Sequence, residues 1–302
     1  MTLSYAWRLV CLSCAVFFLI HLAVGAAVAL GAPAAIRLAE RFSPRRAAGF
    51  LLWLRLLPAM SAAVVVAAVC VPSYLWLEPN AGVEHVGSAC LAAAVLGSAV
   101  WIFGGVRAGR AALRSRRLVR LEQPCLALAG FLRPRLIVSP AVRAVLTAEQ
   151  FEAALAHERA HWASRDNLKR LLLLLAPGLL PFCPGFGRME RAWRRFTEWA
   201  ADDSAAAGSA RRSLSLAAAL VRVARLQTRP VVLPLATSLL GEGPDLAARV
   251  TRLLHLAPRR ATAERSGLPL GAAAALAAAF GAILLHPATL GAAHRLLERL
   301  ME

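Results

Sequence analysis

The sequence is poor in charge, and above all in acidic residues and lysine. Only 17% of its 302 residues are charged, against roughly a quarter in an average soluble protein. It has 35 basic residues against 17 acidic ones, and Lys169 is its one lysine. The hydrophobic fraction is 59%, and the apolar residues come in long blocks. This composition excludes a simple soluble domain, whose surface stays polar, and a disordered basic tail, which lacks large apolar residues. We expect a polytopic membrane protein.

Cysteine motifs and nucleic-acid-binding patterns are missing as well. The six cysteines form no pair of C-x-x-C units, which excludes a zinc site of the ribbon type and indicates no disulfide framework. The net charge of +18 comes almost entirely from arginines beside the apolar blocks. These arginines lack the interleaved aromatic residues of RNA-binding proteins. We therefore assign the charge to membrane topology and anionic lipid, and nucleic acid is an unlikely partner.

Four apolar blocks are long enough to cross a hydrocarbon core of about 30 Å. They cover approximately residues 9–36, 50–77, 86–106 and 268–290. Arg55 lies near the start of the second block, where we expect it to snorkel to the interface. Arginine clusters follow the first and third blocks, so the positive-inside rule places the intervening loop and the region after residue 106 in the cytoplasm.

The predicted fold is therefore mainly α, with about four transmembrane helices and one cytoplasmic domain. The expected domains are three transmembrane helices in 1–106, a cytoplasmic domain in 107–265, and a fourth transmembrane helix with a short extracytoplasmic tail in 266–302. The apolar stretch within 168–184 contains Pro177 and is too short for a confident span, so we interpret it as interfacial or re-entrant. Two short apolar runs in 125–140 predict a pair of strands, either a plain hairpin or an edge that holds a peptide.

A metal-binding motif follows these strands. Thr147 and Gln150 form a capping box, which predicts a helix from about Ala148 past Ala163. The sequence H-E-x-x-H at 157–161 puts His157 and His161 one turn apart on one face of this helix. Two imidazole nitrogens can then reach one zinc ion at about 2.0–2.1 Å each. Glu158, beside the first histidine, is placed to take a proton from the attacking water.

A third ligand is expected from a second amphipathic helix, RMERAWRRFTEWAADDSAAAG at 188–208, whose apolar stripe is Met189, Trp193, Phe196 and Ala200. Glu198 is the best candidate, although an ion pair with Arg194 or Arg195 is an alternative role for it. Asp202 lies one turn later and could accept a hydrogen bond from the free ring N–H of a ligand. The oxyanion-stabilising group stays open among His255, Arg194 and Arg195, because Tyr5 and Tyr74 lie in or beside membrane blocks.

The segments FLRPRLIVSP, LTAEQFEAALAHERAHWASRD, EWAADD and PLATSLLGEGPDLAARVTRLL resemble the membrane zinc metallopeptidases of the BlaR/MecR antibiotic-sensor type. The resemblance implies a multi-pass protein of the bacterial cell membrane with a gluzincin-like zinc domain facing the cytoplasm. It implies one zinc ion per chain, held by His157, His161 and Glu198, with Glu158 as the catalytic base. Asp166 and Asp202 match acidic residues that stand behind such ligands. The implied substrate is a cytoplasmic or membrane-proximal protein, with a transcriptional repressor in a signalling pathway as one candidate.

The chain departs from that family at its C-terminal end. The sensors carry a large penicillin-binding domain after the last span, where about a dozen residues follow here, so we expect no such domain. Two alternatives stay open: a housekeeping membrane protease of the HtpX type, which places two spans between the motif and the glutamate, and a catalytically silent membrane signalling adaptor. Assembly into a homo-oligomer is also left open.

Overall fold

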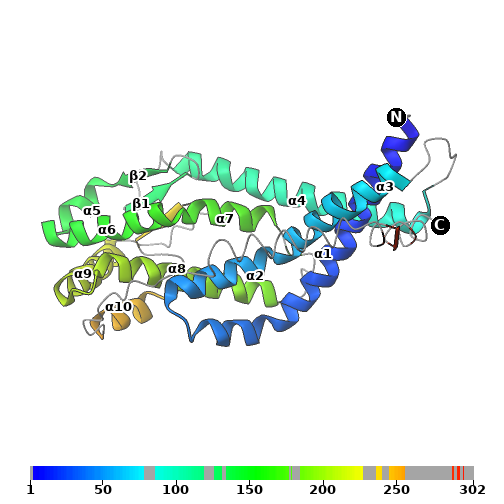
Figure 1. The fold of residues 1–302 in the computed structure, drawn as a ribbon. Helices are drawn as coiled ribbons and strands as arrows, with labels where there is room; N and C mark the ends of the chain where they lie inside the picture. Colours follow the sequence, from blue (N-terminus) through cyan, green and yellow to red (C-terminus); the bar gives the residue numbers. More distant parts are fainter. Residues whose placement is uncertain are drawn as a thin grey trace.

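The computed structural model describes residues 3–77, 86–118, 126–130, 134–176, 178, 184–226, 236–239 and 245–255, together with 288, 291, 292 and 295. Within this part of the chain the protein is mainly helical, with one small sheet (Figure 1). The fourth apolar block, predicted at 268–290, lies outside the described residues apart from one isolated position.

The first three apolar blocks form long helices. They are α1 (Leu3–Ala39), α2 (Pro44–Val65) and α4 (Ser88–Leu118). α2 continues through a π-helical turn, Val66–Cys70, into α3 (Val71–Leu77). Within the described part of the chain, three helical stretches are long and apolar enough to cross a membrane, namely Tyr5–Ala39, Pro44–Leu77 and Ser88–Arg114. α1 packs against both α2 and α4. The three N-terminal candidate spans are therefore confirmed as helices.

The third of these helices is longer than its apolar block. α4 continues for a further 12 residues past Val106, through Arg107, Arg110 and Arg114, and ends at Leu118. Alanine and arginine are both strong helix formers, so the change from apolar to basic composition does not end the helix. The expected domain boundary at 106/107 therefore falls inside a helix, which links the apolar part of the chain directly to the residues that follow.

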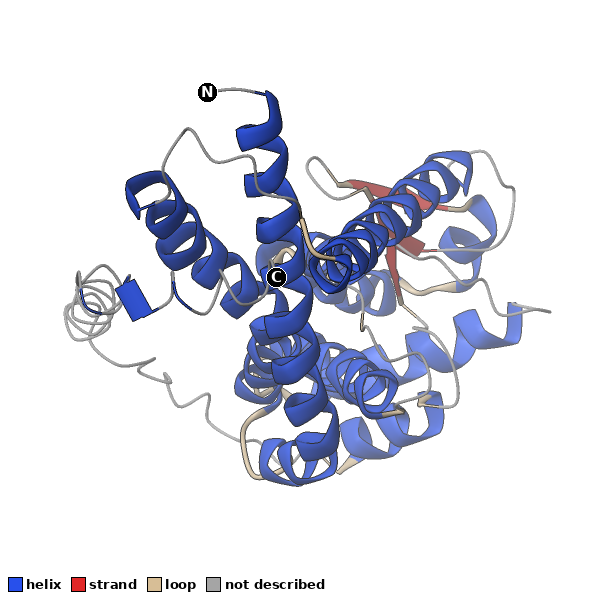
Figure 2. Ribbon diagram, turned by 90° about the vertical axis from the view of Figure 1, so that its right-hand side faces the viewer, coloured by secondary structure: helices blue, strands red, loops and turns tan. Residues whose placement is uncertain are grey.

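Six helices and a small sheet form the rest of the described chain. The helices are α5 (Pro140–Val145), α6 (Ala148–Ser164), α7 (Asp166–Leu175), α8 (Gly185–Ala206), α9 (Ala210–Leu226) and α10 (Leu246–Leu254). The strands are β1 (Leu126–Ala129), β2 (Arg135–Val138) and β3 (Ala236–Ser238), in the antiparallel order β2-β1-β3 (Figure 2). The predicted pair of strands is confirmed as β1 and β2, which are antiparallel with Leu126 opposite Val138. β3 is an addition that sequence reasoning missed.

The site-bearing helices share a core with the sheet and with α9. Leu126, Ala154, Leu216 and Leu220 are buried there together, with Leu239 just after β3. α6 packs against both α8 and α9, and α10 packs mainly against α9. This core fixes the relative positions of α6, α8 and α10, the three helices that carry the polar groups of the site.

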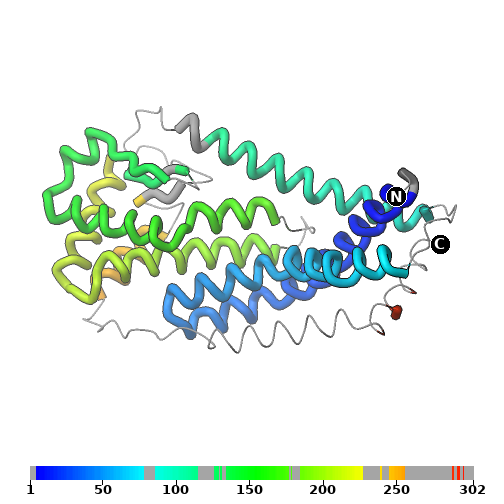
Figure 3. The backbone as a smooth tube through the Cα atoms, turned by 45° about the horizontal axis from the view of Figure 1, so that its top comes forward, coloured from blue at the N-terminus to red at the C-terminus, as the bar shows by residue number. Residues whose placement is uncertain are grey.

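α7 and α8 lie alongside the long N-terminal helices (Figure 3). α7 contacts α4 and α2, and α8 contacts α1 and α2. With 10 residues, α7 is about 15 Å long, which is half of a hydrocarbon core. It is thus too short to cross alone, and the interfacial or re-entrant interpretation of 168–184 stays a prediction. Gly185 opens α8 against the backbone of Ala29, where a Cβ atom would clash.

Arg55 differs from its predicted snorkelling position. Its side chain is buried, and its Nη2 lies 3.0 Å from Oε1 of Glu190 on α8. The guanidinium also lies over the ring of Phe186, 4.5 Å from the centroid. The guanidinium contacts a carboxylate and an aromatic ring on α8 where a snorkelling arginine would contact water. Arg55 therefore links α2 to α8 and does not extend to the membrane interface.

Candidate metal centre

The H-E-x-x-H motif lies on α6, and the start of this helix is fixed by its own side chains. The backbone N–H of Gln150 donates to Oγ1 of Thr147 (3.3 Å), and the backbone N–H of Thr147 donates to Oε1 of Gln150 (3.2 Å). The predicted capping box is thus confirmed. One face of α6 then carries His157, Glu158 and His161, and all three side chains are buried. Burial of three ionisable side chains on one helix face indicates a site and excludes a solvated face.

α6 ends at Ser164, three residues after the motif. Arg165 adopts the left-handed conformation (φ 54°, ψ 41°), and its backbone N–H bonds the carbonyls of His161 and Trp162. This turn starts α7 in a new direction with Asp166 as its first residue. The side chain of Asp166 comes back to the motif, and its Oδ2 lies 2.8 Å from Nδ1 of His161. Asp166 also accepts a hydrogen bond from Lys169 (2.8 Å).

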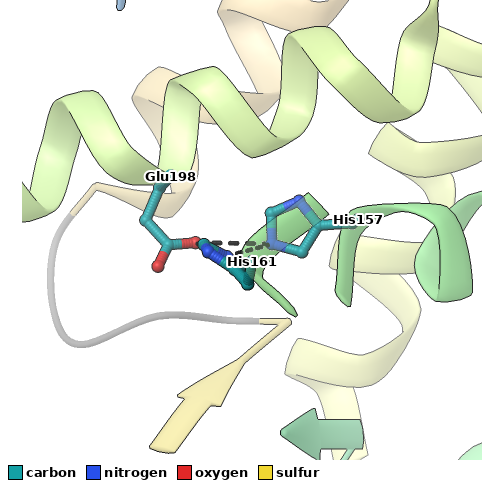
Figure 4. Close-up of side chains that lie close together, drawn as sticks. All are labelled: His157, His161 and Glu198. Atoms are coloured by element: carbon teal, nitrogen blue, oxygen red, sulfur yellow. Dashed lines mark hydrogen bonds and ion pairs between the residues drawn. The ribbon is translucent and has the colours of Figure 1, made fainter. Parts of the chain in front are cut away.

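The second expected helix is α8, and it turns Glu198 toward α6. Met189, Trp193 and Phe196 of the predicted stripe are buried, whereas Ala200 is partly exposed. The alternative role of Glu198 as the partner of Arg194 or Arg195 is not what the structure shows. Arg194 is exposed, and Arg195 pairs with Glu40 at 3.1 Å. Glu198 lies instead beside the two histidines (Figure 4).

Three potential ligand atoms form a compact triangle. Nε2 of His157 and Nε2 of His161 are 3.1 Å apart, and Oε2 of Glu198 lies 3.5 Å and 3.6 Å from them. A tetrahedral ion with bonds of about 2.0–2.1 Å has ligand atoms about 3.3–3.4 Å apart, which matches this triangle. Among the described residues, these three form a buried group that could hold a metal ion. Two imidazoles and one carboxylate are a donor set that suits zinc.

An aspartate lies next to the Nδ1 atom of each histidine. Oδ1 of Asp202 lies 3.0 Å from Nδ1 of His157, and Oδ2 of Asp166 lies 2.8 Å from Nδ1 of His161. Each histidine therefore turns its Nδ1 to a carboxylate and its Nε2 to the centre of the triangle. A carboxylate on the far nitrogen fixes the tautomer and orientation of a ligand imidazole. The structure thus places both aspartates in contact with the two histidines that the sequence predicts as metal ligands.

The electrostatics of the site favour positive charge at its centre. Burial lowers the pKa of His161, but Glu198 and Asp166 outweigh it and raise that pKa to about 10. Burial raises the pKa of Glu198, yet His161 and Arg249 hold it well below its ordinary value. Both oxygens of the ionised Glu198 carboxylate are buried, and neither accepts a hydrogen bond. Such a carboxylate is costly to bury without a cation, and Arg249 and Arg170 lie 3.2 Å and 3.7 Å from its oxygens. A metal ion held by Oε2 would share the carboxylate with these two arginines.

Arg249 is the site residue that sequence reasoning missed. It lies on α10, is 1% exposed, and makes two hydrogen bonds to Asp202, from Nε to Oδ2 (2.8 Å) and from Nη2 to Oδ1 (2.7 Å). Its Nη1 donates to the carbonyl of Leu239 (2.9 Å) and lies 3.2 Å from Oε2 of Glu198. The available signal was an arginine four residues after Asp245, within a segment already quoted for its resemblance, but no spacing rule connects it to the motif.

The structure also changes one expectation and adds one residue to the surroundings of the site. His255, one of the candidates for oxyanion stabilisation, is exposed at the end of α10, as Arg194 is on α8. Asn167, which the sequence did not single out, is buried and donates through Nδ2 to the carbonyls of Leu128 (2.9 Å) and Gly130 (2.7 Å). It ties the start of α7, and hence Asp166, to the end of β1.

Comparisons with protein-family models, with curated proteins and with solved structures gave no match to this chain. The likeness to the BlaR/MecR type therefore stays a resemblance carried by the quoted motifs. What the structure contributes independently is the buried His–His–Glu group and its surroundings.

Proposed function

We propose that this protein is a zinc-dependent endopeptidase of the cell membrane, a gluzincin with one ion per chain. The observation that carries the proposal is the triangle of His157, His161 and Glu198, with a carboxylate behind each imidazole. Structural zinc sites use four protein ligands, whereas catalytic ones use three and keep one position open. Among the described residues three ligands converge, so the donor set favours catalysis.

Each residue of the site has a role in this proposal. His157 and His161 would hold the ion through Nε2 and Glu198 through Oε2, while Asp202 and Asp166 keep the two rings in place. Zinc, when bound, supplies a Lewis acid that polarises a carbonyl and makes water more acidic. Glu158, buried next to His157, takes the proton from the attacking water and delivers it to the leaving amine.

The proposed substrate is a cytoplasmic or membrane-proximal protein, because the candidate ligand helix α8 packs directly on α1 and α2. A transcriptional repressor in a signalling pathway follows from the resemblance alone. An HtpX-type housekeeping protease would place two spans between the motif and the glutamate. Here α7, of 10 residues, is the one helix described between α6 and α8, which supports the signalling-type arrangement over that alternative.

A peptide library tests the proposed activity without knowledge of the substrate. The detergent-purified protein is incubated with zinc and a library of peptides derived from a bacterial proteome, and new termini are identified by mass spectrometry. We expect cleavage by the unaltered protein and a loss of at least about 100-fold in Glu158→Gln, because a general base contributes roughly 10²–10⁴-fold. Glu152→Gln makes the same change at an exposed position of α6 and should retain activity.

The variants separate an enzyme from an adaptor. Cleavage that persists in Glu158→Gln would come from a contaminant or from a different base. No zinc-dependent cleavage of any peptide by a protein that holds zinc would contradict the protease proposal and favour the silent adaptor.

A further inference from the structure

Arg249 turns two of its N–H groups toward the candidate metal centre. A guanidinium has five N–H groups, and three of Arg249's are taken, two by Asp202 and one by the carbonyl of Leu239. One N–H remains on each terminal nitrogen. Nη1 lies 3.2 Å from Oε2 of Glu198, and Nη2 lies 3.5 Å from Nε2 of His157. Both remaining donors therefore face atoms that belong to the ligand triangle.

These two contacts cannot both persist when the triangle holds a cation. A metal ion would use the lone pair of Nε2 of His157 and a lone pair of Oε2 of Glu198. Nε2 of His157 has no second lone pair, so the Nη2 N–H group of Arg249 would then need another acceptor at the same place, whereas Oε2 of Glu198 keeps a lone pair for Nη1. In a peptide hydrolase, the acceptor that arrives there is the carbonyl oxygen of the scissile bond, which gains negative charge during attack by water.

We propose that Arg249 donates to the scissile carbonyl oxygen and stabilises the negative charge that develops on it. The inference rests on the proposed function and supplies the oxyanion-stabilising group that it lacks. Charged donors are suited to this task because charge-assisted hydrogen bonds are roughly twice as strong as neutral ones. A donor that is already fixed in a dry site also needs no reorganisation during the reaction.

Other candidates are placed less well. Tyr5 and Tyr74 contact each other in the N-terminal helices, each hydroxyl donating to the other's backbone carbonyl at 3.3 Å. Arg170 approaches Glu198 at 3.7 Å, but on Oε1, the oxygen outside the ligand triangle. Burial lowers the pKa of Arg249, but Asp202 and Glu198 outweigh it and raise that pKa, so its charge is permanent.

A purely structural role makes a different prediction. As a clamp between Asp202 and Leu239, Arg249 would affect every ligand of the metal equally. As an oxyanion-stabilising group, it affects only ligands that place an oxygen beside it. Phenylphosphonate and thiophenol share a ring and an anionic head, but the first binds metals through oxygen and the second through sulfur.

The experiment is a spectroscopic titration of the cobalt-loaded, detergent-purified protein with each of these two probes. In Arg249→Lys, we expect affinity for phenylphosphonate to fall roughly 10- to 100-fold, since one charge-assisted hydrogen bond is lost. Affinity for thiophenol should change by less than about threefold. Arg252→Lys is the matched control, one turn away on α10, where Arg252 pairs with Asp203 outside the site.

An equal loss for both probes, or no loss for either, would overturn the role of Arg249 while leaving the proposed function intact. If Arg249→Lys does not fold, the structure of the unaltered protein with cobalt and phenylphosphonate decides. We expect a phosphonate oxygen about 3 Å from a terminal nitrogen of Arg249, and an oxygen turned away from it would overturn the proposal. An unaltered protein that binds no cobalt or zinc would instead refute the proposed function itself.

Discussion

At the scale of single residues, the site depends on side chains that are not candidate ligands themselves but contact the candidate ligands. Asp202 is shared by His157 and Arg249, and its pKa is about 2 because Arg249 and His157 outweigh the effect of burial, which would raise it. Asp166 is similarly shared by His161 and Lys169. Each aspartate therefore stays ionised at neutral pH and fixes the imidazole in front of it.

The pair Asp202 and Asp203 offers a matched test of this role. Asp202→Asn removes the charge behind His157, and we expect the affinity for zinc to fall roughly 10- to 100-fold, as is typical of partners of metal ligands. Asp203→Asn alters a partly buried pair with Arg252 outside the site and should leave the affinity within about twofold. Competition with a chromogenic chelator measures both, and equal affinities for the two variants would contradict the role of Asp202.

The residues predicted from the sequence were those with a local signature. His157 and His161 follow from a spacing of four on a helix whose capping box is readable, and Glu198 follows from the chemistry of a missing third ligand. Arg249 could not be predicted, because its contacts with Asp202 and His157 span 47 and 92 residues of chain. Only the packing of α10 against α8 and α9 brings them together.

At the scale of elements, the junction of α6 and α7 positions the site. A helix that continued past Ser164 would carry Asp166 away from His161. The left-handed Arg165 ends α6 one residue before Asp166, although this conformation costs a residue other than glycine about 1–2 kcal/mol. Because Arg165 is exposed, its side chain offers no packing that would explain the conformation, and the direction of α7 imposes it.

Two glycine substitutions on α6 should therefore have opposite signs. Arg165→Gly relieves the left-handed strain and should raise stability by about 0.5–1 kcal/mol. Arg159→Gly places the same residue at an exposed position inside the helix and should lower stability by about 1 kcal/mol. Thermal unfolding in one detergent compares them, and a loss of stability in Arg165→Gly would show that the side chain, not the turn, matters at this position.

The long elements were predictable and the short ones were not. Continuous apolar blocks indicated α1 and the first part of α4, and the absence of proline and glycine between residues 148 and 176 indicated α6. β3 has three residues, Ala236–Ser238, and is a strand only because β1 pairs with it across more than 100 residues, with Ala127 opposite Ser238. A segment this short carries no periodicity of its own, so tertiary pairing decides its conformation.

At the scale of the whole molecule, the candidate metal centre is coupled to the helices that can cross a membrane. α8 carries Glu198, and the same helix packs on α1 through Gly185 and on α2 through the pair of Arg55 and Glu190. A displacement of α1 or α2 would thus move Glu198, the candidate third ligand. Because Glu198 lies on α8, the candidate metal centre is on the same side of the bilayer as this part of α8.

The orientation of the chain can be tested with single cysteines in a background without the native six. Arginines follow the first and third candidate spans, so the site should face the cytoplasm. Ser204→Cys, exposed on α8, should react with an impermeant maleimide only in inverted vesicles. Ser88→Cys, exposed at the start of α4, should react only in spheroplasts. Labelling of both from one side, or in the reverse order, would contradict the topology.

The most direct test of the central claim is the zinc content of the detergent-purified protein, compared with His157→Ala and Glu158→Gln. We predict about one zinc ion per chain in the unaltered protein, none in His157→Ala, and about one in Glu158→Gln, because a ligand is lost in the first variant and only a base in the second. An unaltered protein without stoichiometric zinc would contradict the account, as would a Glu158→Gln variant that is folded but has lost its metal.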